Sequence, residues 1–372
     1  MSGQHRQPSG ILSRLSLRRT SLWVAAVLGA CSVPIGSTSP PMFDLAPATV
    51  SLPPGKVFGL AWLNDGWLVV NYRADPEGVF GSSRLSRFRP DGSGFAEIAL
   101  PEDPTCRLLE YIRPVALSDG RLGYVRECLK AGMSPGEEFE ASLGALDLAT
   151  GQTEVLAPVV SGVGYAGIAS FDWDPTIGAG LISIGSGICQ GIEWIDKNGP
   201  RPIDLVVSDG DQQFNLADEF RRPSTDCSAT GRADDPALSP TDGRVAFFAS
   251  PASVGREGHA RLFAPSNLYI ADSELKTVTL SVKDVKVHGE LGWSPDGRWL
   301  AFPGEVGAMG RGAWLFDTTS SRLQRFTDMS LGRTAWSPDG FSLAAIDAPN
   351  DPSVGQRIHV FDLRELLADV QP

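Results

Sequence analysis

The chain has 372 residues, of which 42% are hydrophobic and 20% are charged, so it can bury a sizeable core. Its formal net charge of −12 argues against nucleic acid and against an anionic membrane surface as partners. The 41 glycines and 28 prolines indicate many turns and short elements rather than long helices.

Residues 1–30 have the features of an export signal. Four arginines and no acid precede or flank an apolar run, SLWVAAVLGA, that is too short to span a bilayer as a helix. The segment LGAC, Leu28 to Cys31, resembles the lipobox of bacterial lipoproteins. This resemblance implies that Cys31 carries the lipid of the mature protein. The alternative is an ordinary signal peptide with a cysteine there by chance.

Removal of residues 1–30 takes away the four arginines, so the net charge moves from −12 to −16. A body this acidic is expected to be held at a membrane by its N-terminal lipid and not by charge. Residues 31–53 are expected to form a tether, because the stretch from Ser32 to Met42 is rich in Ser and Pro.

From residue 54 onward one pattern recurs. Two copies contain WSPDG, with Trp293 and Trp336 at equivalent positions 43 residues apart, and the segment 235–250 keeps the pattern with one inserted residue. Weaker copies lie upstream. The anchor residues of the units, in chain order, are Trp62, Leu117, Trp173, Leu238, Trp293 and Trp336.

Each unit also has a second half, such as GALDLATGQTEVLAP at 144–158, which reads as a strand, a polar hairpin and a further strand. A unit therefore holds four short strands and leaves no room for a long helix. The fold class expected for residues 54–370 is all-β, a six-bladed β-propeller with four-stranded antiparallel blades. An array of β-sandwiches would not explain a turn that recurs once per four strands.

The WSPDG-x-x-LAF unit resembles the WD40-like repeat of TolB-type propellers, which also occurs in the propeller domain of the prolyl oligopeptidase family. The resemblance implies an extracytoplasmic bacterial protein. Serine hydrolysis of the prolyl oligopeptidase kind is not expected, because the chain contains no G-x-S-x-G elbow. In many propellers one terminus completes the blade formed by the other, so Ala48 to Pro54 is a possible ring-closing strand beside the segment 358–370.

Four cysteines follow the signal segment, and an even number in an exported protein indicates two disulfides. Three pairings are possible. The expected one joins Cys106 to Cys128 and Cys189 to Cys227, because each pair is the closest along the chain.

The repeat aspartates are Asp65, Asp119, Asp242, Asp296 and Asp339. The order Ser, Pro, Asp, Gly suits a type I turn, and a group that recurs in several units is expected to shape the chain and not to catalyse. No metal site and no cofactor are expected, since the four histidines are scattered and the acidic segment 208–220 lacks the spacing of an EF-hand loop.

Alignment of the units on their anchors brings several polar residues to one strand-start position, where the loops of a propeller converge on its axis. These residues are Arg113, Ser170, Asp235, Glu290 and Arg333. They are expected to form a channel-mouth site for a peptide or small polar ligand. The alternative is mutual ion pairing between neighbouring blades without a ligand.

The function expected from these features is binding or scaffolding in the bacterial cell envelope, by a lipid-anchored, monomeric ring without catalytic residues. The partner is expected to be an envelope protein or peptide. The resemblance supplies an analogy, since the TolB channel receives part of a partner lipoprotein, but this sequence matches the fold pattern alone and that partner is not carried over to it. A propeller-type hydrolase or lactonase with its site at the central channel is the alternative.

Overall fold

The structure is a computed structural model that describes residues 43–53, 55–74, 83–130, 139–162, 168–186, 189–203, 205–209, 212–215, 232–250, 265–287, 289–347 and 356–368. Apart from the single turn η2 (Gly307–Met309) and the short helix α1 (Arg364–Ala368), all regular elements of these residues are strands. The expected all-β class is confirmed. No helix in this part of the chain is long and apolar enough to cross a membrane.

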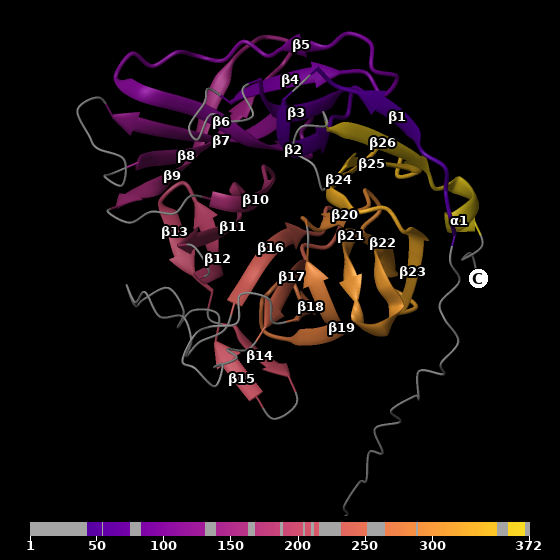
Figure 1. Cartoon of the computed structure of the whole chain (residues 1–372). Helices are drawn as coiled ribbons and strands as arrows, with labels where there is room; N and C mark the ends of the chain where they lie inside the picture. Colours follow the sequence, from indigo (N-terminus) through magenta and orange to yellow (C-terminus); the bar gives the residue numbers. More distant parts are fainter. Residues whose placement is uncertain are drawn as a thin grey trace, which may run out of the picture. The chain divides into compact units, whose positions relative to one another are not determined.

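Three antiparallel four-stranded sheets follow one another along the first half of the chain (Figure 1). The first contains β2 (Lys56–Trp62), β3 (Leu68–Arg73), β4 (Arg84–Phe88) and β5 (Ala96–Glu97). The second contains β6 (Cys106–Ala116), β7 (Leu122–Lys130), β8 (Phe139–Leu146) and β9 (Thr153–Gly162). The third contains β10 (Ile168–Asp174), β11 (Ala179–Ser186), β12 (Cys189–Asp196) and β13 (Gly199–Pro202).

A hairpin of β14 (Val206–Asp209) and β15 (Gln212–Asn215) precedes an eight-stranded sheet. One half of this sheet contains β16 (Arg232–Leu238), β17 (Val245–Ser250), β18 (Ser266–Ala271) and β19 (Val278–Val287). The other half contains β20 (Gly292–Trp293), β21 (Trp299–Val306), β22 (Gly310–Asp317) and β23 (Arg322–Thr327). The halves are joined where β19 pairs with β21 over three residues.

The last sheet takes its strands from both ends of the described chain. It contains β24 (Leu331–Trp336), β25 (Ser342–Asp347), β26 (Arg357–Asp362) and, at its edge, β1 (Ala48–Ser51). β1 runs antiparallel to β26, with Ala48 opposite Val360 and Ser51 opposite Arg357. Figure 1 shows the indigo β1 beside the yellow β26. Val50 is the buried residue of β1 and packs into the core against the first sheet.

The sheets are arranged as in a propeller. The first strands contact one another in succession, from β2 to β6, β10, β16, β20 and β24, and β24 contacts β2 in turn. Apolar clusters fill the spaces between the faces of successive sheets. A further cluster joins the last sheet to the first, with Ile358 and Ala344 against Trp62 and Val70. The core is therefore divided among the sheet interfaces, while the first strands line the axis.

The repeat turns explain how each first strand reverses into the second. In the Ser294–Gly297 turn, the Gly297 N–H donates to the Ser294 oxygen at 2.9 Å, and Gly297 has a φ of 69°. Asp296 accepts the N–H of Arg298 at 3.1 Å. The other four repeat aspartates likewise accept the N–H two residues ahead, at 3.1 to 3.2 Å. These bonds give the aspartates a direct part in shaping the turns.

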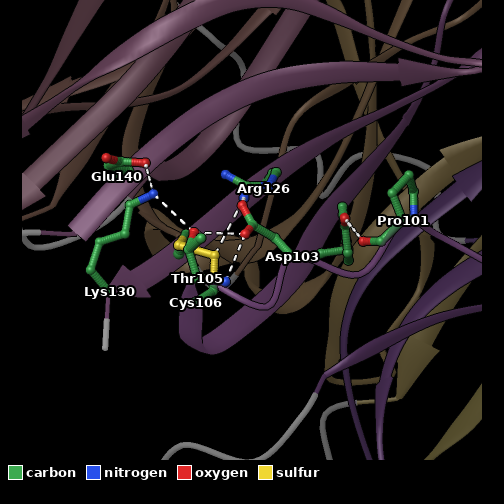
Figure 2. Close-up of a disulfide and its surroundings, with 9 residues drawn as sticks. Pro101, Asp103, Thr105, Cys106, Arg126, Lys130 and Glu140 are labelled. Atoms are coloured by element: carbon green, nitrogen blue, oxygen red, sulfur yellow. Dashed lines mark hydrogen bonds and ion pairs between the residues drawn. A yellow bond between two sulfur atoms is a disulfide. The ribbon is translucent and has the colours of Figure 1, made fainter. Parts of the chain in front are cut away.

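Cys106 and Cys128 form the expected disulfide between β6 and β7, with a Cα to Cα distance of 5.4 Å. Figure 2 shows Asp103 beside it. The Asp103 carboxylate accepts the Thr105 N–H and hydroxyl at 2.9 and 2.6 Å and pairs with Arg126. The hydrogen bonds from Thr105 lower the pKa of Asp103. Cys31, Cys227 and the side chain of Cys189 lie outside the described residues, so the second disulfide stays a prediction.

Candidate functional site

β-Bulges interrupt five of the first strands. In β2, β6, β10, β16 and β24 the pairing register with the second strand shifts within the strand, between Ile112 and Val115 in β6 and between Asp234 and Ala237 in β16. Arg113, Asp235 and Arg333 lie in these shifts. Arg113 and Asp235 each precede a proline and adopt positive φ values of 56° and 50°. A bulge bends its strand and redirects a side chain, which here brings charged groups together at the axis.

Glu290 is at the centre of these charged groups. Its carboxylate pairs with the guanidinium of Arg333 and lies 3.8 Å from that of Arg113. All three side chains are partly buried, at 17 to 24% exposed. Burial lowers the pKa of Arg113, while the nearby Asp235 and Glu127 raise it. The structure thus brings together charged residues that the alignment of the units had selected. Their ion pairs match the alternative in which neighbouring blades pair with one another and no ligand is bound.

A second acidic pair adjoins Arg113. Glu110 of β6 lies directly opposite Glu127 of β7, and Arg73 pairs with Glu110 at 3.3 Å. Burial and the charge of Glu110 raise the pKa of Glu127, while Arg113 lowers it. This pair extends the charged cluster on the side of β6 and β7.

A cavity of about 530 Å³ lies at the first strands, beside Glu290. All the first strands supply lining residues, from Leu60 to Trp62 in β2 through to Thr334 to Trp336 in β24. Turn residues, among them the exposed Pro240 and Pro295, line it as well. The cavity therefore extends from the charged cluster to the repeat turns. A volume of this size is in the range of small-molecule sites.

Tryptophans from four units line the cavity, namely Trp62, Trp173, Trp293 and Trp336. Two of them also connect neighbouring first strands. The Trp293 indole donates to the oxygen of Ala237, and the Trp336 indole to the oxygen of Gly292, both at 3.0 Å. These two tryptophans therefore connect neighbouring first strands and also form part of the cavity wall.

Asp172 is the feature of the cavity that the sequence analysis missed. Its carboxylate accepts the N–H groups of Trp173 and Leu238, both at 2.8 Å. Burial raises the pKa of Asp172 to about 6. The two hydrogen bonds lower the pKa, but their effect is smaller than that of burial. The sequence carries a signal. The residue before the anchor is Asp172 in the third unit and Ala or Gly in the others, namely Ala61, Ala116, Ala237, Gly292 and Ala335.

Two hydroxyl groups at the cavity have no hydrogen-bond partner in the structure. They belong to Ser170, which is 5% exposed, and Thr334, which is 8% exposed. Buried hydroxyl groups are normally hydrogen-bonded, so each such exception calls for an explanation. Of the residues predicted from the sequence, Ser170, Asp235 and Glu290 line the cavity. Arg113 and Arg333 do not line it, but both pair with Glu290.

The carboxylates of the described cavity residues do not lie close enough to one another to bind a metal ion together. Within the described residues, the one group of three close ligand atoms is Asp103 with Cys106 and Cys128. Both of those sulfur atoms belong to the disulfide. A thiolate, and not a disulfide sulfur, is the usual ligand, so this group does not fit a metal site.

The fold is shared with several solved propellers. The α-L-arabinanase of Penicillium chrysogenum, in complex with arabinobiose, matches 87% of this chain and 99% of its own, with a TM-score of 0.56 and 12% identity. The α-L-arabinofuranosidase Arb93A of Fusarium graminearum, in complex with an iminosugar inhibitor, matches 89% of this chain and all of its own, with a TM-score of 0.53 and 11% identity.

TolB from Acinetobacter baumannii is also similar, with a TM-score of 0.46 and 15% identity over 83% of this chain, which spans 64% of the length of the TolB chain. No protein-family model and no curated protein sequence matches the chain. At these identities the likeness is one of fold alone, and this chain shares an all-β propeller fold with the α-L-arabinanase and the α-L-arabinofuranosidase.

Proposed function

We propose that the chain is a binding module of the bacterial cell envelope, which holds a peptide segment or small polar ligand in its central cavity. In this proposal residues 1–30 are a lipoprotein signal, Cys31 carries the lipid, and residues 31–53 form the tether and the ring-closing strand β1. Residues 54–370 form a monomeric six-bladed propeller in which each half of the eight-stranded sheet counts as one blade.

The observation that carries the binding function is the cavity itself. It has the volume of a ligand site, and the hydroxyl groups of Ser170 and Thr334 lie at it without partners. A ligand that hydrogen-bonds to them would remove the cost of their burial. The ion pairs of Glu290 give the cavity a rigid charged boundary, because each partner holds the other in place.

Affinity capture tests this proposal. The full-length chain, in detergent-solubilised envelopes, is compared with Ala116→Trp, which places a large ring at an exposed position of the cavity wall. Ala149→Trp, in the exposed outer hairpin between β8 and β9, is the matched control. The expected result is that a partner or ligand co-purifies with the wild type and the control but not with Ala116→Trp. Equal retention by all three would exclude the cavity as the site.

Mass spectrometry of the mature N-terminus tests the anchor. The proposal requires cleavage before Cys31 and a lipid on this residue. An unmodified Cys31, or cleavage at another residue, would contradict the lipoprotein assignment without affecting the proposal for the cavity.

Hydrolysis in the cavity is the second candidate function, and Asp172 is the observation that favours it. Its raised pKa of about 6 leaves it partly protonated near neutral pH. A carboxyl group with a pKa close to the working pH can act as a general acid or base in hydrolysis. Cleavage of arabino-oligosaccharides or lactones that is lost in Asp172→Asn, but not in Asp147→Asn in the outer hairpin, would support this function. Absence of turnover with both substrate classes would count against it.

A further inference from the structure

The charged residues that line the cavity are all acidic. They are Asp172, Asp174, Asp235 and Glu290, and the described lining contains no lysine or arginine. Glu290 pairs with Arg113 and Arg333, neither of which is part of the lining. The carboxylates of Asp172 and Asp174 are hydrogen-bonded to backbone N–H groups. These two acids give the cavity a negative potential, which favours a positively charged occupant.

Asp172 differs in kind from the residues at the equivalent position of the other units. The position before the anchor residue contributes a lining residue from every unit, and in five units that residue is alanine or glycine. The small side chains leave space on the axis, and Asp172 alone supplies a charge there. The other five units accept a small residue at this position, so the repeat itself does not require an acid there.

The walls suit an organic cation. Trp173 follows Asp172 directly, and Trp62, Trp293 and Trp336 line the same cavity. The face of an indole attracts an ammonium or guanidinium group, and the attraction is larger where water is excluded. The carbon chain of a lysine or arginine side chain packs well on such rings.

The cavity lining also contains two hydroxyls without a hydrogen-bond partner in the structure, those of Ser170 and Thr334. An ammonium group has three N–H donors. A carboxylate at Asp172 accepts such donors, and the hydroxyl oxygens of Ser170 in β10 and Thr334 in β24, both more than nine-tenths buried, are acceptors on two different strands of the cavity lining. A bare divalent cation prefers converging oxygens at short distance, which the described acids at the cavity do not offer.

We propose that the ligand of the central cavity carries an amine or guanidinium group, supplied by a basic side chain or the amino terminus of a peptide. The charged head lies beside Asp172, and its carbon chain runs along the tryptophan walls. This inference rests on the proposed binding function and specifies the chemistry of the ligand.

Calorimetric titration of the full-length chain in detergent at pH 7.5 tests the inference with matched probes. Nα-acetyl-lysine methylamide and Nα-acetyl-arginine methylamide carry a side-chain cation, glycine ethylamide carries only an amino terminus, and the Nε-acetylated lysine probe is neutral. We expect at least one cationic probe to bind ten times more tightly than the neutral probe. The probe that binds best identifies the source of the charge.

Variants locate the site. Asp172→Asn should weaken binding of the cationic probe at least tenfold, whereas Glu274→Gln, in the exposed outer hairpin between β18 and β19, should leave it unchanged. Thr334→Val keeps the shape of the side chain and removes one partnerless hydroxyl, so it should fold normally and weaken binding severalfold. Unchanged binding in both Asp172→Asn and Thr334→Val would overturn the inference.

Other occupants give distinct results. Equal binding of the cationic and neutral probes, or binding of calcium or of a neutral disaccharide in preference to every cationic probe, would overturn the inference. If envelope capture still depends on Ala116 in that case, the proposed binding function stands without its cationic ligand. If Ala116→Trp changes neither capture nor probe binding, the proposed function fails as well.

Discussion

The indole Nε1 of Trp336 donates a hydrogen bond of 3.0 Å to the main-chain oxygen of Gly292, the residue before Trp293 in the preceding first strand. Trp293 makes the same bond to Ala237, the residue before Leu238. The tryptophan of the WSPDG unit thus connects one first strand to the next. Because both rings also line the cavity, the residues that specify the fold form part of the site.

Trp336→Phe should destabilise the fold. The substitution keeps an aromatic ring but leaves the partly buried oxygen of Gly292 without its donor, which costs about 1 kcal/mol of unfolding free energy. Urea unfolding followed by circular dichroism measures the loss. Trp67→Phe is the control, since the Trp67 ring stacks on Arg89 within its own sheet, 4.0 Å from the guanidinium carbon. Equal losses in the two variants would show that the bond across the sheets contributes nothing of its own.

The fold was predictable because its signals are local. The turn Ser294–Gly297 needs a proline and a glycine at fixed positions, and it is followed by the short strand β21, which is buried at seven of its eight residues. The same local pattern recurs in each unit, so its period indicated a propeller. The Cys106–Cys128 pair was predictable for the same reason, since it joins adjacent strands of one sheet.

The cavity was only partly predictable because it depends on side chains from distant units. Alignment on the anchors brought Glu290 and Arg333 to one level, and the structure places them in an ion pair. Asp172 was missed, although it breaks the Ala/Gly pattern before the anchors. Its partner N–H belongs to Leu238, 66 residues away, and this contact follows from the arrangement of the sheets and not from local sequence.

Asp296→Ala tests the structural role of the repeat aspartates. The Asp296 carboxylate accepts the Arg298 N–H and the Ser294 hydroxyl, so its loss should lower the unfolding free energy by about 1 kcal/mol. Ligand or partner binding should not change, which affinity capture measures. A variant that folds with wild-type stability but no longer binds would give the turn a functional role instead.

The disulfide between Cys106 and Cys128 should stabilise the chain measurably. A crosslink with a sequence separation of 22 residues restricts the unfolded chain, which is worth about 3 kcal/mol. The double variant Cys106→Ser/Cys128→Ser should show this loss in urea unfolding under oxidising conditions. Reductant should then lower the stability of the wild type by more than that of the double variant. Equal effects of reductant on both proteins would contradict a stabilising role for this bond.

β1 should contribute to stability through Val50, its buried residue. Val50→Asp places a charge in the apolar cluster between the last and first sheets and should cost several kcal/mol, because a buried charge without a partner is unfavourable. Ser51→Asp, one residue along the same strand but exposed, is the matched control and should change stability little. Deletion of residues 43–54 should lower the melting temperature by many degrees. If Val50→Asp melts like Ser51→Asp, the pairing of β1 with β26 does not stabilise the chain.

Asp172 should make stability fall as pH rises. Its pKa of about 6 in the folded chain exceeds the value of about 4 for an unfolded aspartate, so the folded state binds the proton more tightly. The stability from the protonated form is fully present below the unfolded pKa and is lost as pH rises through about 6. Asp172→Asn abolishes this titration, so its stability relative to wild type should rise by about 2 kcal/mol between pH 4 and pH 7.5.

Urea unfolding of both proteins at the two pH values measures this difference, in which the titration of all other groups cancels. Asp147→Asn is a control of opposite sign. Backbone N–H groups of Thr150 and Ala149 lower the pKa of Asp147, so its contribution is present above the unfolded pKa and is lost as pH falls. Most of this change falls below pH 4, so between pH 4 and pH 7.5 the Asp147 variant should show only a small loss of stability relative to wild type. A pH-independent difference for Asp172→Asn would show that the cavity leaves this carboxylate as well solvated as in the unfolded chain.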